Sequence, residues 1–153
     1  MYLYTLLLIF IIIIAPFSLL WHELGHVFGA KMVRASHVTL TIGVGKPILK
    51  RTYQNVTFII CKIFLFNSLT ETKRPYLLSR RDKVVITFMG PMSSLILGLV
   101  AYCLYIFIAP HLLLYGLFLF NMWIGLINLI PFKINERQSD GYTILQMIKN
   151  KYD

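Results

Sequence analysis

The feature that most constrains this chain is a run of 49 residues, Val84 to Phe132, without a charged side chain. A helix rises about 1.5 Å per residue and must cross about 30 Å of hydrocarbon, so this run is long enough for two membrane spans. Residues 1–30 contain a single charged residue, Glu23, and predict one more span. Because 58% of the residues are hydrophobic and 14% charged, the composition also favours an integral membrane protein over a soluble domain.

We therefore expect a mainly α-helical membrane protein whose residues 1–153 form a single domain. Its three transmembrane helices are predicted near residues 3–30, 84–108 and 112–131. The break between the last two is expected at Ala109-Pro110-His111. The first segment lacks a basic start and a small-residue cleavage site, and its apolar run is too long for a secretory signal, so we expect it to be retained.

The basic residues are unevenly distributed. Eleven of the 15 Lys and Arg lie between Lys31 and Lys83, where Glu71 and Asp82 are the only acids. The positive-inside rule then places the middle loop and the C-terminus in the cytoplasm and the N-terminus outside a membrane that we expect to be prokaryotic. We interpret the net charge of +9 as topology and contact with anionic lipid, and expect no nucleic-acid partner.

Between the first two spans, the sequence predicts a small cytoplasmic β-sheet within residues 37–66. Three β-rich runs are separated by turns: residues 37–42, 48–53 and 56–66. The turns are predicted at Gly43-Val44-Gly45-Lys46-Pro47 and at Gln54-Asn55. From Asn67 to Lys83 the sequence is polar and basic, which predicts an exposed connector.

At the end of the first span, His22-Glu23-Leu24-Gly25-His26 places two histidines four residues apart on one helix face. Both imidazoles can then reach one cation, and Glu23 lies where it can take a proton from a bound water. Counted back from Lys31, His26 would lie about 7 Å and His22 about 13 Å into the inner leaflet. Ionisable side chains are costly at that depth unless a metal compensates them or they reach water at an interfacial helix end.

Two other features of the first span predict helix packing. Gly25 and Gly29 form a G-x-x-x-G pattern, which would let a neighbouring helix approach closely. Pro16 predicts a kink within the span. Trp21 is interpreted as a packing residue.

A hydrolytic metal site needs three protein ligands and an exchangeable water, so a third ligand is required. The candidate acids are Glu71, Asp82, Glu136, Asp140 and Asp153. Asp140 is favoured because the third span ends on the same side as the first, and residues 144–148 predict a short helix that returns to the membrane. Gly141 would give the backbone freedom to turn this carboxylate inward. Taken alone, Asp140 could equally be a helix N-cap.

In these features the chain resembles the site-2 protease family of intramembrane zinc metalloproteases. His22-Glu23-Leu24-Gly25-His26 is similar to the family's metal motif, and Thr41-Ile42-Gly43-Val44-Gly45 to its strand and Gly-rich turn. Met89-Gly90-Pro91 resembles the start of its second core helix. Asn121, Asn128-Leu129-Ile130-Pro131 and Asp140-Gly141 resemble its paired asparagines, the N-L-x-P end of its third core helix and its Asp-Gly motif.

The resemblance covers nearly the whole chain and implies a minimal core without PDZ or CBS domains. It implies one Zn²⁺ per chain held by His22, His26 and Asp140, with Glu23 as the catalytic base. The implied reaction is hydrolysis of a peptide bond in or near a transmembrane segment of a membrane-protein substrate, as in regulated intramembrane proteolysis. The residues that would bind or support the substrate are Asn121, Asn128, Gly43 and Gly45. Interhelical hydrogen bonding is the alternative for the two asparagines.

The chain departs from the family at two places. Pro91 is followed by Met92-Ser93-Ser94 where the family usually has an asparagine, so a polar role there would fall to a serine. The stretch from Pro131 to Asp140 is longer than the family's short connection, and Ser139 replaces its leucine.

Other classes of function stay open at this point. A non-haem iron oxygenase also uses two histidines and a carboxylate, but it would leave Glu23 without a role. A metal transporter would need a polar path across both leaflets, whereas the outer halves of the spans are apolar. A catalytically inactive relative could bind membrane helices as a regulatory protein. The expected partners are a transmembrane protein or peptide substrate, the lipid bilayer and, as a further option, a second copy of the chain. An exposed edge of the 37–66 sheet could hold the substrate extended by strand addition.

Overall fold

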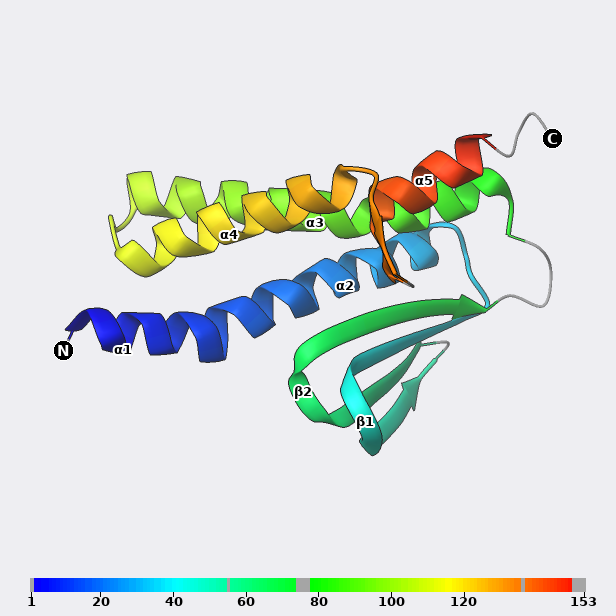
Figure 1. Cartoon of the computed structure of the whole chain (residues 1–153), viewed down its shortest axis with the longest axis horizontal. Coiled ribbons are helices and arrows are strands. Elements are labelled where there is room, and N and C mark those ends of the chain that lie inside the picture. Colours follow the sequence, from blue (N-terminus) through cyan, green and yellow to red (C-terminus); the bar gives the residue numbers. More distant parts are fainter. Residues whose placement is uncertain (1, 55, 74–77, 136, 150–153) are drawn as a thin grey trace.

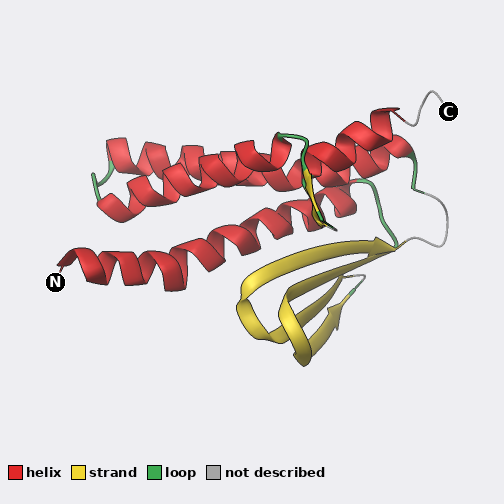
Figure 2. Ribbon diagram, viewed as in Figure 1, coloured by secondary structure: helices red, strands yellow, loops and turns green. Residues whose placement is uncertain are grey.

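The computed structural model describes residues 2–54, 56–73, 78–135 and 137–149, in which long helices pack together and a sheet lies against the first of them (Figure 1). The first helical segment comprises α1 (Tyr2–Ile9), the π-helical turn η1 (Phe10–Ile14) and α2 (Ala15–Met32). After the sheet come α3 (Arg80–Phe107), α4 (Leu112–Leu129) and the short α5 (Asp140–Lys149), all drawn as helices in Figure 2.

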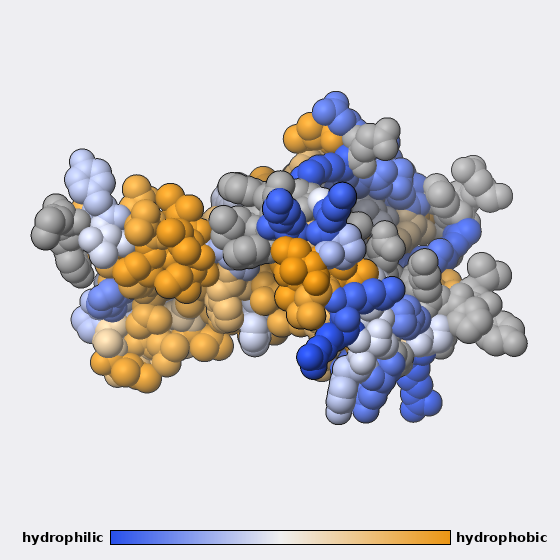
Figure 3. Space-filling model, turned by 90° about the horizontal axis from the view of Figure 1, so that it is seen from below, coloured by the Kyte–Doolittle hydropathy of each residue, from blue (hydrophilic) through white to orange (hydrophobic). Residues whose placement is uncertain are grey.

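Within this part of the chain, three helical stretches are long and apolar enough to cross a membrane: Leu3–Met32, Arg80–Phe107 and Leu112–Leu129. The predicted spans are thereby confirmed, as is the break at residues 109–111. In Figure 3, hydrophobic side chains dominate the half of the molecule that contains the N-terminal end of the first segment, and hydrophilic ones are more frequent over the half that contains the sheet.

The α-helix of the first span is interrupted just before Pro16. Pro16 has no N–H to donate to the carbonyl of Ile12, and the turn that precedes it is π-helical, with the Ala15 N–H bonded to the Phe10 carbonyl. The predicted kink near Pro16 therefore takes the form of a π-helical turn.

The second span begins earlier than predicted, at Arg80 rather than near Val84. A capping box causes this: the Ser79 hydroxyl accepts from the Asp82 N–H at 3.1 Å, and the Asp82 carboxylate accepts from the Ser79 N–H at 3.0 Å. The predicted connector from Asn67 to Lys83 is thus wrong at its end, and also at its start, because the second strand of the sheet continues to Lys73.

The sheet is built from two long strands, β1 (His37–Tyr53) and β2 (Val56–Lys73). Each strand bends, so that the start of β1 pairs with both ends of β2. Thr39, for example, lies between Glu71 and Thr57, and residues 49–53 of β1 pair with residues 56–60 of β2. The predicted sheet is confirmed, as is the turn at Gln54, whereas Asn55 lies outside the described residues. The predicted turn at residues 43–47 is a bend within β1, made possible by Gly43 and Gly45 with φ angles of 86° and 97°.

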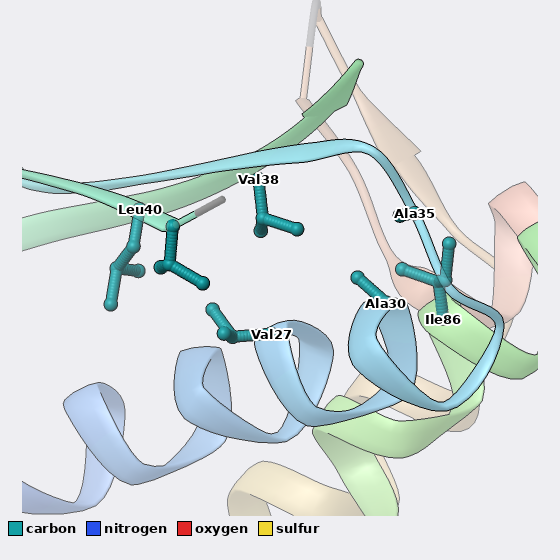
Figure 4. Packing of buried hydrophobic residues seen from close by; sticks show 7 residues of the cluster. Val27, Ala30, Ala35, Val38, Leu40 and Ile86 are labelled. Carbon is teal, nitrogen blue, oxygen red and sulfur yellow. The ribbon is translucent and has the colours of Figure 1, made fainter. Parts of the chain in front are cut away.

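A small apolar core attaches the sheet to the helices (Figure 4). Val27 and Ala30 of α2 face Val38 and Leu40 of β1, and Ile86 of α3 lies next to Ala30 at one end of the cluster. Leu40 and Ala30 are fully buried. This contact holds the sheet beside the last turns of α2, the helix that carries the histidine motif.

Candidate metal centre

Small residues allow α2 and α3 to approach closely beside the histidine motif. A Cβ on Gly25 would collide with the Met89 carbonyl and the Ser93 side chain, and one on Gly29 would lie 2.9 Å from the Met89 Cβ. The predicted close packing at the G-x-x-x-G pattern is therefore confirmed. On the α3 side, Gly90 leaves space for the ring of His26, because a Cβ there would overlap the imidazole.

A hydrogen bond from the Trp21 side chain links the two helices at this contact. The Trp21 indole N–H donates to the Ser93 carbonyl at 3.1 Å, while the Ser93 hydroxyl lies closer to the Gly90 carbonyl of its own helix, at 2.7 Å, than to the Trp21 carbonyl, at 3.2 Å. Trp21 thus does more than the predicted packing. The next residues of the two helices, His22 and Ser94, also meet.

Each histidine is held through its Nδ1 atom. The Nδ1 of His22 lies 3.0 Å from the hydroxyl oxygen of the fully buried Ser94. The Nδ1 of His26 lies 2.9 Å from the Ile86 carbonyl oxygen, which can only accept, so His26 Nδ1 carries the proton. In the neutral ring, the Nε2 atom of His26 then presents a lone pair, which is the state that a metal requires.

The carboxylate reaches the same place from the end of the chain. After α4 come two short antiparallel strands, β3 (Lys133–Ile134) and β4 (Arg137–Gln138), which pair as a hairpin. Ser139 closes its base: the buried hydroxyl donates to the Ile130 carbonyl at 2.7 Å and accepts from the N–H groups of Phe132 at 3.0 Å and Tyr142 at 3.1 Å. The extra residues of this connection are therefore looped out, and Asp140 follows directly from the closed base.

Ser139 is also the N-cap of α5, because its carbonyl accepts the first helical hydrogen bond, from Thr143, and its hydroxyl accepts from Tyr142. The alternative role of Asp140 as the N-cap is wrong, and its carboxylate faces the histidines instead. The expected role of Gly141 needs correction as well. Gly141 lies within α5 and its φ is not positive; it is required because a Cβ there would collide with the Leu129 carbonyl at the end of α4.

The three predicted ligands converge. One ligand atom from each of His22, His26 and Asp140 lies within 4.8 Å of the others. The Nε2 atom of His22 is 3.2 Å from one oxygen of Asp140, and the Nε2 atom of His26 is 3.6 Å from the other. With its proton on Nδ1, a neutral His26 places an acceptor against the carboxylate, which is also an acceptor. A shared cation satisfies both, so the donor set fits a metal ion.

The match to a known family decides what kind of protein carries this centre. The model of peptidase family M50, the site-2 protease family, matches residues 8–113. The chain belongs to peptidase family M50. No match was found among curated proteins. The matched region contains both histidines and Glu23 and ends before Asp140, so the third ligand is supported by the geometry of the structure. Membership suggests a peptidase, and M50 peptidases depend on zinc.

The remaining M50-like residues differ in how the structure places them. Asn121 is fully buried and donates through Nδ2 to the Ser18 hydroxyl at 2.8 Å, which confirms the interhelical alternative and braces α4 against α2 one turn from His22. Asn128 donates to the Ile124 carbonyl of its own helix at 2.9 Å. The described contacts leave a substrate role for these asparagines as a prediction, and the same holds for Gly43 and Gly45.

The acids that were not favoured as ligands lie elsewhere. Asp82 belongs to the capping box of α3. Glu136 and Asp153 fall outside the described residues, as does the side chain of Glu71. Glu23 follows His22 on the same turn of α2 and is half-buried. Two contributors were missed by sequence reasoning, namely the indole of Trp21 and the capping role of Ser139. A serine at the site of an expected leucine was the only sign of the latter.

Proposed function

We propose that this M50 protein is a zinc-dependent endopeptidase that hydrolyses a peptide bond in or near a transmembrane segment of a membrane protein. The observation that supports it best is the convergence of His22, His26 and Asp140 within 4.8 Å, with the rings held from behind by Ser94 and the Ile86 carbonyl. A set of three protein ligands leaves one position open for water, which is the arrangement of hydrolytic sites.

In this proposal the chain's own residues divide the work. One bound Zn²⁺ per chain supplies Lewis acidity, which lowers the pKa of a coordinated water and polarises the carbonyl of the scissile bond. Glu23 takes a proton from the attacking water as its oxygen bonds to the carbonyl carbon. Glu23 then delivers that proton to the leaving nitrogen as the C–N bond breaks, giving a carboxylic acid and an amine. Ser94 and the Ile86 carbonyl keep the two rings oriented.

The substrate must be extended at the scissile bond, since a helix hides its backbone groups. We propose that an edge of the sheet holds it by strand addition. The last part of β2 supports this, because it pairs on one side with residues 37–42 and runs beside α2 (Figure 1). Two variants, Leu69→Pro and Thr70→Pro, test this. Successive N–H groups of a strand point to opposite sides, so one of the two variants removes an N–H from the side that would bind the substrate. If neither variant altered cleavage, this role of the sheet would be lost.

Glu23→Gln tests the proposed reaction. Wild type and variant are co-expressed with a library of small membrane proteins, and fragments that depend on the wild type are identified by mass spectrometry. The variant should keep its metal, because its histidines and Asp140 are unchanged, yet lose cleavage by about 100-fold or more. Zinc content of both purified proteins is the control. Equal cleavage by both proteins would exclude Glu23 as the base, and no fragment from any candidate would favour a non-catalytic M50 relative.

A further inference from the structure

The outer arm of the sheet, residues Lys46 to Tyr53 of β1, is exposed on both faces. It pairs with β2 along one side, through Lys50 opposite Ile59 and Thr52 opposite Thr57, and every residue from 45 to 54 is exposed. Among the described residues, no strand pairs with its other side. The arm is therefore held in place by the sheet but covered by none of the described part of the chain.

The chemistry of the arm is unusual for a surface strand in water. Ile48 is 68% exposed and Tyr53 is 70% exposed, and between them stand the exposed Leu49, Lys50 and Arg51. Since successive side chains of a strand point to opposite faces, each face combines large apolar groups with basic ones. Such a mixture, with a tyrosine, suits the boundary between lipid headgroups and hydrocarbon.

The position of the arm and the charge around it agree with that boundary. The sheet lies alongside the last turns of α2 rather than beyond its end (Figure 1), where a predicted membrane span ends at Met32. Residues 31–70 contain six Lys and Arg and no Asp or Glu. Anionic headgroups attract basic segments of this kind.

From these observations we infer that the outer arm binds the headgroup layer of a bilayer that contains anionic lipid. A peptide strand added to the free edge would cover that edge and leave both faces exposed, whereas a lipid layer takes up apolar and basic groups from either face. An arm bound to the bilayer surface would hold the whole sheet at a set position, including the edge of β2 that is proposed to bind the substrate. The inference itself does not depend on whether the protein cleaves peptides.

Hydrogen exchange of the full chain in lipid nanodiscs tests this inference. The backbone N–H groups of Lys46 and of residues 48–53 are followed in discs of phosphatidylcholine alone and in discs that also contain phosphatidylglycerol. We expect slower exchange in the anionic discs, by about fivefold for each engaged basic side chain. Salt at about 1 M should abolish the difference, because the Debye length falls to about 3 Å.

The charge-reversed variant Lys50→Glu with Arg51→Glu should lose the lipid dependence. Lys133→Glu with Arg137→Glu, which makes the same charge change on the exposed β3–β4 hairpin, is the matched control and should keep it. Equal exchange of the wild-type arm in both kinds of disc would overturn the inference. Protection that appeared only with an added acidic peptide, to the same extent in both discs, would also overturn it and assign the arm to a peptide partner.

Discussion

Replacing Ser94 by alanine should weaken metal binding without disturbing the helix contact. The Ser94 hydroxyl lies 3.0 Å from His22 Nδ1 in a fully buried position. Its loss leaves a buried ring N–H without a partner, at a cost of about 1–3 kcal/mol. Residues that orient a metal ligand in this way typically contribute about 10- to 100-fold to metal affinity, equivalent to about 1.4–2.7 kcal/mol, so the two estimates agree.

The assay is zinc affinity of the purified chain, measured by competition with a chelator in detergent or nanodiscs. ¹⁵N NMR of the zinc-bound protein adds a second reading: with Nε2 on the metal, the ring proton lies on Nδ1 in both proteins, and the Nδ1 shift should change in Ser94→Ala because its hydrogen bond is lost. Ser93→Ala is the matched control, because Ser93 bonds the carbonyls of Trp21 and Gly90 rather than a histidine. Unchanged zinc affinity in Ser94→Ala, or an equal loss in Ser93→Ala, would refute the role of this hydroxyl.

Three further substitutions follow from packing. Gly90→Ala should displace the ring of His26, lowering zinc affinity about 100-fold or more in the same competition assay, whereas wild-type affinity would contradict the contact. Gly141→Ala should push α5 away from the Leu129 carbonyl and so displace Asp140, which should weaken zinc binding at least about 10-fold. An unchanged affinity would show that α5 packs against α4 in another way. Leu40→Ala should weaken the packing of the sheet against the helices by about 2–5 kcal/mol, and proteolysis within β1 should therefore become faster. An unchanged rate of proteolysis would argue against the apolar core of Figure 4.

Local patterns in the sequence account for the spans and for the histidine pair. Charge-free runs long enough to cross a bilayer require only the helical rise, and the spacing of His22 and His26 requires only the helical period. The end of β2 could not be found in this way. Residues 70–73, Thr-Glu-Thr-Lys, have no apolar alternation, and they form a strand because they pair with the start of β1.

The carboxylate side of the site shows a different limit. Asp140 was predicted from the side of the membrane on which its segment lies, and the structure brings it to the histidines. The predicted reason for Gly141, backbone freedom, was nevertheless wrong. Its hydrogen side chain is needed for the close contact between α5 and Leu129 of α4, and no local sequence pattern indicates such a contact. The anchoring of Ser139 depends on Ile130 and Phe132, which become its neighbours only after the hairpin has formed.

The central claim is that His22, His26 and Asp140 form one zinc centre, and X-ray absorption at the zinc edge tests it most directly. The purified chain should hold one zinc whose nearest shell contains only nitrogen and oxygen, with imidazole nitrogens at about 2.0–2.1 Å. Asp140→Asn, measured alongside, should bind zinc more weakly. A shell with sulfur at about 2.3 Å, which would implicate Cys61 or Cys103, or a wild-type chain that binds no zinc, would contradict the claim.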